Sequence, residues 1–186
     1  MLDENMSKSE LERELDEKGD FIQIDIINKF LDRSSGLKRD TKKFLFLRLA
    51  EIYERRLMIG EAAKMYDNLG ILVISYSEKI KYFLMETKLF ISKGEFNRAE
   101  EAMKKAIAQA NSVDRENINF EVKHFYKEQA REYEEKMRRA HAVRIYEKLL
   151  EMGLDFQERK EIKEKLLKLY DKLGEIRKYE SLKGLK

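Results

Sequence analysis

The stretch Phe44–Gly70, FLFLRLAEIYERRLMIGEAAKMYDNLG, decides the fold. Its apolar residues recur at spacings of three and four, which is the period of one face of an α-helix. The pattern breaks near Ile59-Gly60 and then resumes, so the stretch predicts two amphipathic helices joined by a tight turn. A hairpin of this kind has an apolar face that a neighbouring element must cover.

The same residue types return twice downstream at the same spacings. Five of the eleven alanines fill the six slots for a small residue, and eight of the nineteen Phe and Tyr residues fill the nine aromatic slots. Small residues let two helices approach closely, and aromatic rings fill the space around the contact. The spacing therefore predicts a stack of similar hairpins. The three copies are Phe46, Ala50, Tyr53, Ala62, Tyr66 and Leu69; Phe83, Thr87, Phe90, Ala99, Met103 and Ala106; and Tyr126, Ala130, Tyr133, Ala142, Tyr146 and Leu149.

Weaker copies flank these three, and the repeat starts are separated by 37, 43 and 37 residues (46 to 83, 83 to 126, 126 to 163). We expect one domain over residues 1–186, with a divergent helix pair in 1–36, three repeats in 37–152 and a capping pair in 153–186. Capping boxes are predicted to begin at Ser9 and Ser75. Gly70 is predicted to end a helix in the left-handed conformation.

These residues resemble the tetratricopeptide repeat (TPR), most closely in the turn Lys93-Gly94-Glu95-Phe96-Asn97-Arg98-Ala99. The resemblance covers residues 43–150 and is partial at both ends. The spacings exceed the family's usual period of about 34, and the chain contains no proline. The longer helices are similar to those of adaptors such as the soluble NSF attachment proteins. The resemblance implies an all-α, right-handed α-α superhelix of antiparallel helical hairpins, a TPR-like solenoid.

The resemblance also implies a function, which is a non-enzymatic scaffold or adaptor that holds a partner's peptide or helix in its concave groove. In this family the first helix of each hairpin lines that groove. The positions expected to bind the partner are Leu47, Arg48, Glu51, Leu84, Met85, Lys88, Lys127 and Arg131. Leu47, Leu84 and Met85 are expected to form its exposed apolar centre. The alternative is that the N-terminal helix pair folds over this patch.

Catalytic and metal-binding signatures are weak in this chain. It contains no cysteine, and its eight glycines form no phosphate-binding loop. Glu121 and His124 have the spacing of half a di-iron site, but His141 has no glutamate three residues before it. We therefore expect no metal, no cofactor and no enzymatic activity.

The net charge of +3 is unevenly distributed, with −5 over residues 1–36 and +4 over residues 157–186. Such polarity is compatible with self-association. Lys104-Lys105, Arg138-Arg139 and the C-terminal lysines make a nucleic-acid-associated helical repeat protein the alternative function. Nucleic acid is the less favoured partner, because the basic residues alternate with glutamates.

The N-terminus lacks an apolar core and no run of about 18 apolar residues exists, so we expect a cytoplasmic protein without membrane insertion.

Overall fold

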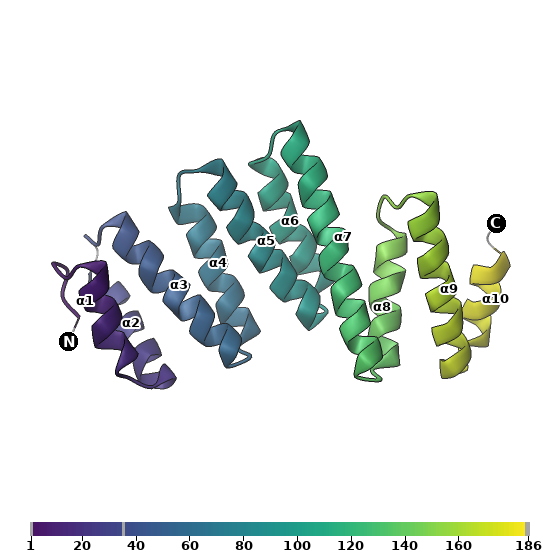
Figure 1. The fold of residues 1–186 in the computed structure, drawn as a ribbon, viewed down its shortest axis with the longest axis horizontal. Coiled ribbons are helices and arrows are strands. Elements are labelled where there is room, and N and C mark those ends of the chain that lie inside the picture. Colours follow the sequence, from purple (N-terminus) through teal and green to yellow (C-terminus); the bar gives the residue numbers. More distant parts are fainter. Residues whose placement is uncertain (1, 35, 185–186) are drawn as a thin grey trace.

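The structure, a computed structural model, describes residues 2–34 and 36–184, which form ten α-helices and no strand (Figure 1). This confirms the predicted all-α class. Each helix packs chiefly against its neighbours in the chain, and the helices follow one another along the longest axis from the N-terminus to the C-terminus. The helices are α1 (Lys8–Asp16), α2 (Asp20–Arg33), α3 (Arg39–Arg55), α4 (Ile59–Leu72), α5 (Tyr76–Lys93), α6 (Phe96–Ala108), α7 (Ser112–Glu135), α8 (Arg139–Leu150), α9 (Phe156–Leu173) and α10 (Ile176–Gly184).

One turn geometry joins the helices within four of the pairs, from α3–α4 to α9–α10. In each turn one residue adopts a left-handed backbone conformation, and the next amide N–H donates to a carbonyl five residues earlier. This arrangement satisfies carbonyl groups that the helix end leaves without partners. The turn residues are separated by 37, 43 and 37 residues, which confirms the predicted register. They are Leu57 (φ 58°), Gly94 (φ 75°), Met137 (φ 58°) and Gly174 (φ 68°).

The slots for small residues lie at the closest helix contacts. Ala50, Thr87, Ala62, Ala99, Ala130 and Ala142 are each at most 1% exposed. Aromatic residues then link one pair to the next. The ring of Tyr66 in α4 stacks 6.4 Å from that of Tyr82 in α5, and Phe96 in α6 lies 5.8 Å from Tyr126 in α7. The core is therefore continuous along the row of pairs.

Some contacts also recur with a longer period, in which two pairs form the unit. The hydroxyl of Tyr66 donates to Glu54 across the α3–α4 pair, and Tyr146 donates to Glu134 in the same way across α7–α8. Ion pairs join the first helices of successive pairs at Lys43–Glu78 and again at Lys123–Glu158. Each second contact lies 80 residues after the first. The unit α3–α6 is thus repeated in α7–α10.

Several predicted helix ends are wrong. Ser7, rather than Ser9, caps α1, because its side chain accepts from the amide of Glu10. Ser75 stands at the N-cap of α5 without a capping box, and Glu78 instead pairs with Lys43. At the start of α7, the side chain of Asn111 caps the helix by accepting from the amide of Asp114. Gly70 does not end a helix, since α4 continues past it to Leu72.

Gly70 is a packing residue rather than a cap. A Cβ atom added there would lie 2.5 Å from Cε1 of the Phe83 ring, which is closer than two non-bonded carbon atoms can approach. Phe83 belongs to α5 and is buried, so its ring has little room to move. The absence of a side chain at residue 70 therefore allows α4 and α5 to come together.

We expect Gly70→Ala to destabilise the protein by about 1–2 kcal/mol, although alanine favours a helix by about 0.5–1 kcal/mol over glycine. Gly60→Ala in the same helix is the matched control, because its added Cβ would meet only the end of Lys93, at 4.0 Å. Urea unfolding of the two variants measures the difference. Equal midpoints would contradict the close contact between Gly70 and Phe83.

Candidate functional site

The structure does not form the apolar groove centre that the sequence predicts. Leu84 is only 6% exposed, so the expectation that it faces solvent is wrong. Leu47 and Met85 are half-buried and pack against the core. The reason is that α5 packs against α4, α6 and α7, which together cover most of its circumference.

The charged positions predicted to bind a partner instead take part in contacts between helices. Arg48 donates to Gln23 at 2.8 Å and also pairs with Asp16, so the N-terminal helix pair covers this part of α3. Lys88 in α5 lies 3.6 Å from a carboxylate oxygen of Glu128 in α7. Glu51 and Arg131 are exposed.

Lys127 in α7 donates to Glu158 in α9 at 2.7 Å. This hydrogen bond, together with one from Lys123, holds the pKa of Glu158 down at about 2. The carboxylate is therefore charged at neutral pH, and the pair joins the third and fourth repeats. The eight predicted residues thus lie on α3, α5 and α7 without converging on one apolar site.

An apolar cleft of about 330 Å³ lies between α6, α7 and α8. Met103 and Ile107 of α6 form one wall, and Met152, just after α8, lies opposite. The floor consists of Val122 and Tyr126, both on α7 and both buried. Burial raises the pKa of Tyr126 to about 12, so its hydroxyl stays neutral in the physiological range. The remaining lining residues are Ala99, Glu100, Lys104, Asn119, Lys148 and Gly153.

Charged groups cross the cleft between α6 and α8. Lys148 of α8 pairs with Glu100 of α6 at 2.5 Å and with Glu151 at 2.8 Å. The hydrogen bonds that the Lys148 ammonium donates to these two carboxylates raise the pKa of Lys148. The ammonium is therefore charged and already bonded, and it fixes the separation of the two walls.

A second recess of about 570 Å³ continues from the cleft and shares Asn119, Met152 and Gly153 with it. Its additional lining comes mainly from the first turns of α7 and includes Phe120, which is 68% exposed. Because the two hollows share lining residues, we treat them as one trough with an apolar end beside α6 and another end beside the exposed ring of Phe120. We call this trough the α6–α8 cleft.

The cleft exists because the junction between the second and third repeats differs from the other two. The repeat starts are 43 residues apart here, and α7 has 24 residues where α5 has 18. In addition, Met103 occupies the slot that Tyr66 and Tyr146 fill in the neighbouring repeats. Both irregularities are visible in the sequence, but neither determines how far α6 and α8 separate, so the sequence alone does not predict the cleft.

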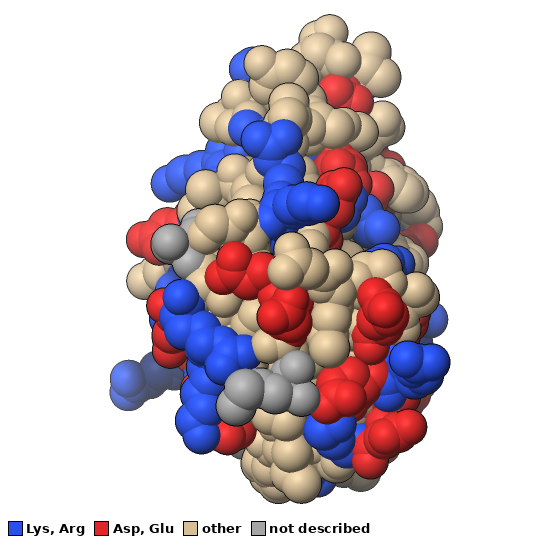
Figure 2. Space-filling view, turned by 90° about the vertical axis from the view of Figure 1, so that its left-hand side faces the viewer, with Lys and Arg blue, Asp and Glu red and all other residues tan. Residues whose placement is uncertain are grey.

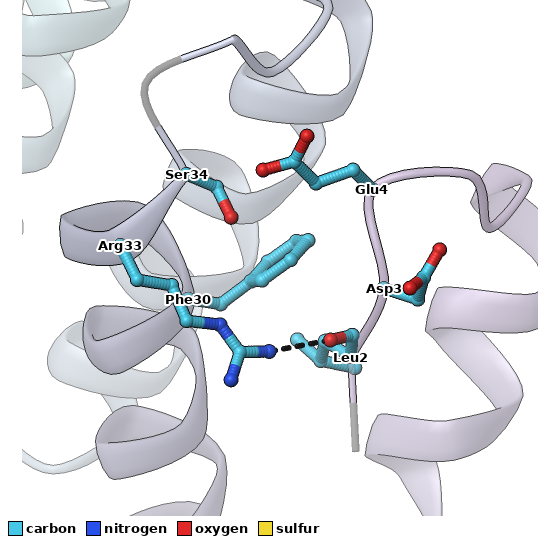
Figure 3. A pocket seen from close by; sticks show the side chains of 6 residues that line it. All are labelled: Leu2, Asp3, Glu4, Phe30, Arg33 and Ser34. Atoms are coloured by element: carbon cyan, nitrogen blue, oxygen red, sulfur yellow. Dashed lines mark hydrogen bonds between the residues drawn. The ribbon is translucent and has the colours of Figure 1, made fainter.

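Another hollow lies where the N-terminal segment crosses the end of α2 (Figure 3). Its lining consists of Leu2, Asp3, Glu4, Phe30, Arg33 and Ser34. The guanidinium of Arg33 donates to the carbonyl of Leu2 at 2.5 Å, and Leu2 is 2% exposed. These contacts hold the N-terminal segment against α2, so we assign this hollow a structural role.

Within residues 2–34 and 36–184, no group of three or more His, Cys, Asp or Glu side chains is placed to hold a metal ion. His124 lies 3.2 Å from a carboxylate oxygen of Glu128.

None of the described helices is long and apolar enough to cross a bilayer. Comparison of the chain with protein families, with curated proteins and with solved structures gives no match.

Proposed function

We propose that this chain is a TPR-like solenoid, coiled as a right-handed superhelix, that serves as a non-enzymatic scaffold or adaptor. Its occupant at the α6–α8 cleft is an amphipathic helix of another protein. The observation that carries this proposal is the cleft itself, which is apolar, open to solvent and placed where the repeat is irregular.

The lining chemistry favours an apolar anchor in a helix over a charged or highly polar ligand. Ligand sites combine a mainly apolar lining with a few polar groups that fix orientation. Here the methionines at 103 and 152 supply flexible walls that adapt to a side chain, as methionine commonly does at helix-binding surfaces. An amphipathic helix repeats its apolar residues every three or four positions. One such residue would occupy the apolar end of the cleft beside α6, and another would contact the ring of Phe120.

Nucleic-acid binding remains the alternative, and it draws less support from the charges. Lys105 belongs to one of the basic clusters, but its ammonium donates to Asp67 at 2.7 Å and to Glu86 at 3.0 Å. Lysines that already pair with carboxylates have little charge to offer to phosphates.

The test uses a displayed library of amphipathic peptides of about 15 residues, near the length at which isolated helices begin to form. Peptides selected on the wild-type protein are expected to bind with micromolar Kd. The variant Phe120→Glu/Met152→Glu should weaken them at least about tenfold, because it places charge beside the apolar anchors. Fluorescence anisotropy gives the Kd of each variant.

The control is Ile176→Glu, which introduces one glutamate at a residue that is 73% exposed on α10, away from the cleft. It should leave the Kd unchanged. Circular dichroism establishes that the variants stay folded. The assignment of the site would be refuted if the selected peptides bind Phe120→Glu/Met152→Glu as tightly as the wild type but no longer bind Ile176→Glu.

A further inference from the structure

One edge of the molecule carries an unusual group of exposed apolar side chains. They are Ile71 in the last turn of α4 (69% exposed), Ile74 in the connection between α4 and α5 (69%) and Tyr76 at the start of α5 (68%). Three large apolar residues within six positions form a patch rather than the scattered exposure normal for a monomer. In Figure 1 this connection lies at the upper edge of the row of helices.

Basic residues lie directly beside this patch. Residues 36–43, which lead into α3, contain Lys38, Arg39, Lys42 and Lys43, and the Lys43–Glu78 ion pair holds this segment against the start of α5. We call residues 36–43 and 71–81 the α3–α5 edge. It contains six basic and two acidic side chains, a net charge of +4. Figure 2 shows Lys and Arg gathered in a band across the upper half of the N-terminal face.

The helix ends add to this positive charge. The N-termini of α3 and α5 both point to the α3–α5 edge (Figure 1), and a helix N-terminus carries about half a positive charge. Within the described part of the chain, the side chains of the N-cap residues Lys38 and Ser75 accept no hydrogen bond from a first-turn backbone amide, and the Ser75 hydroxyl bonds instead to that of Ser77. Side chains cap the starts of α1, α7 and α9, whereas the described starts of α2, α4, α6 and α8 resemble those of α3 and α5 in having no such bond. The first-turn amides of α3 and α5 are thus not occupied by a capping side chain.

We propose that the α3–α5 edge docks the protein on the surface of a membrane that contains anionic phospholipids. The three apolar side chains enter the headgroup region, while the exposed Lys38, Arg39 and Lys81 and the helix ends face the lipid phosphates. Stable peripheral binding generally takes two signals, such as apolar burial and a polybasic patch, and this edge supplies both. Docking of this kind requires no spanning helix. It uses a different surface from the α6–α8 cleft.

The apolar chemistry distinguishes a membrane from nucleic acid as the occupant. Single-stranded nucleic acids are held by aromatic side chains on which bases stack. Two of the three exposed residues are isoleucines, whose branched side chains offer no stacking face. Tyr76, with Lys79 lying 5.9 Å from its ring centroid, is an aromatic and basic pair that suits the lipid interface.

The experiment is flotation of the full chain with vesicles of phosphatidylcholine alone or mixed with phosphatidylserine. We expect binding to the mixed vesicles only, weakening as salt rises. Lys38→Ala/Arg39→Ala should reduce the partition coefficient about fivefold for each residue removed. Ile74→Ser/Tyr76→Ser should reduce it about tenfold or more, and the high exposure of both residues keeps this variant folded.

The matched control is Phe156→Ser. Phe156 is the counterpart of Tyr76 80 residues later, also at the first position of a helix and 85% exposed, but it lies between Asp155 and Glu158. This variant should float like the wild type. The proposal is overturned if the wild type does not float with phosphatidylserine vesicles or if the control loses binding as Ile74→Ser/Tyr76→Ser does. It is also overturned if the protein binds an RNA or DNA probe through the edge residues and does not bind the vesicles.

Discussion

Replacing Lys105 by methionine is expected to lower the free energy of unfolding by about 3 kcal/mol at pH 7. Lys105 joins three helices, because its ammonium on α6 donates to Asp67 of α4 and to both carboxylate oxygens of Glu86 on α5. Glu86 is 5% exposed, so the substitution leaves a buried carboxylate without its cation. The side chain of Lys105 is 39% exposed, which places the loss at the low end of the range for buried pairs.

The loss should depend on pH in a defined direction. Burial raises the pKa of Glu86 above its ordinary value of 4.5, and Lys105 opposes that rise. Without Lys105 the pKa of the folded state rises further, so the native state binds a proton at a pH where the unfolded state does not. Stability then increases as the pH falls towards 4.5. The difference between Lys105→Met and the wild type should therefore be largest at neutral pH and smaller near pH 4.

Lys104→Met provides the control, because residue 104 is the adjacent lysine and is exposed. It should change stability by less than about 0.5 kcal/mol. The double variant Lys105→Met/Glu86→Leu should recover much of the loss, since replacing both partners removes the unpaired charge. Denaturant unfolding at several pH values measures all three. A loss in Lys105→Met that is independent of pH would mean that the ion pair is not its cause.

The second large effect is expected at Leu84. Leu84→Asp should cost about 4 kcal/mol or more, because removing a buried leucine side chain costs about 2–5 kcal/mol and a buried carboxylate adds to that loss. At 6% exposure the aspartate has no access to solvent in the native state. Loss of the cooperative thermal transition, or a large fall in the guanidinium midpoint, is the expected observation.

Leu57→Asp makes the same chemical change at a residue that is 82% exposed. Its backbone lies in the left-handed region, with φ at 58°, which aspartate tolerates better than leucine does. We expect its stability to match or exceed that of the wild type. If Leu84→Asp is as stable as the wild type, Leu84 is not buried and faces the groove as the sequence predicts.

The sequence predicts the fold well at positions where only one kind of packing explains the residue type. The alanine slots predict close contact between backbones, and all of them are buried. The repeat register follows from these slots, and the left-handed turns at Gly94 and Gly174 have the same spacing. Leu57 and Met137 occupy the equivalent turns without glycine, so composition alone does not reveal the turn there.

The candidate sites were less predictable, because exposure depends on neighbouring helices rather than on periodicity. Leu84 has the position of a groove residue in its own helix, but the helices around α5 bury it. Glycine is typical of a helix end, but at residue 70 its missing side chain instead leaves room for the ring of Phe83. The α6–α8 cleft depends on the separation of helices that are distant in sequence, which local patterns do not encode.

The α6–α8 cleft also affects how the chain responds to denaturant. In a row of pairs, stability is approximately the sum of each repeat's own stability and the coupling to its neighbours. The cleft leaves less apolar packing between α6 and α8, and α7 contacts α5 and α6 less extensively than α5 contacts α4. The two 80-residue units are therefore coupled less strongly to each other than the two repeats of the first unit are, and we expect denaturant to separate the units more readily. If a partner helix binds in the cleft as we propose, it would contact both units at once, and its binding energy would strengthen the cooperativity of unfolding of the whole chain.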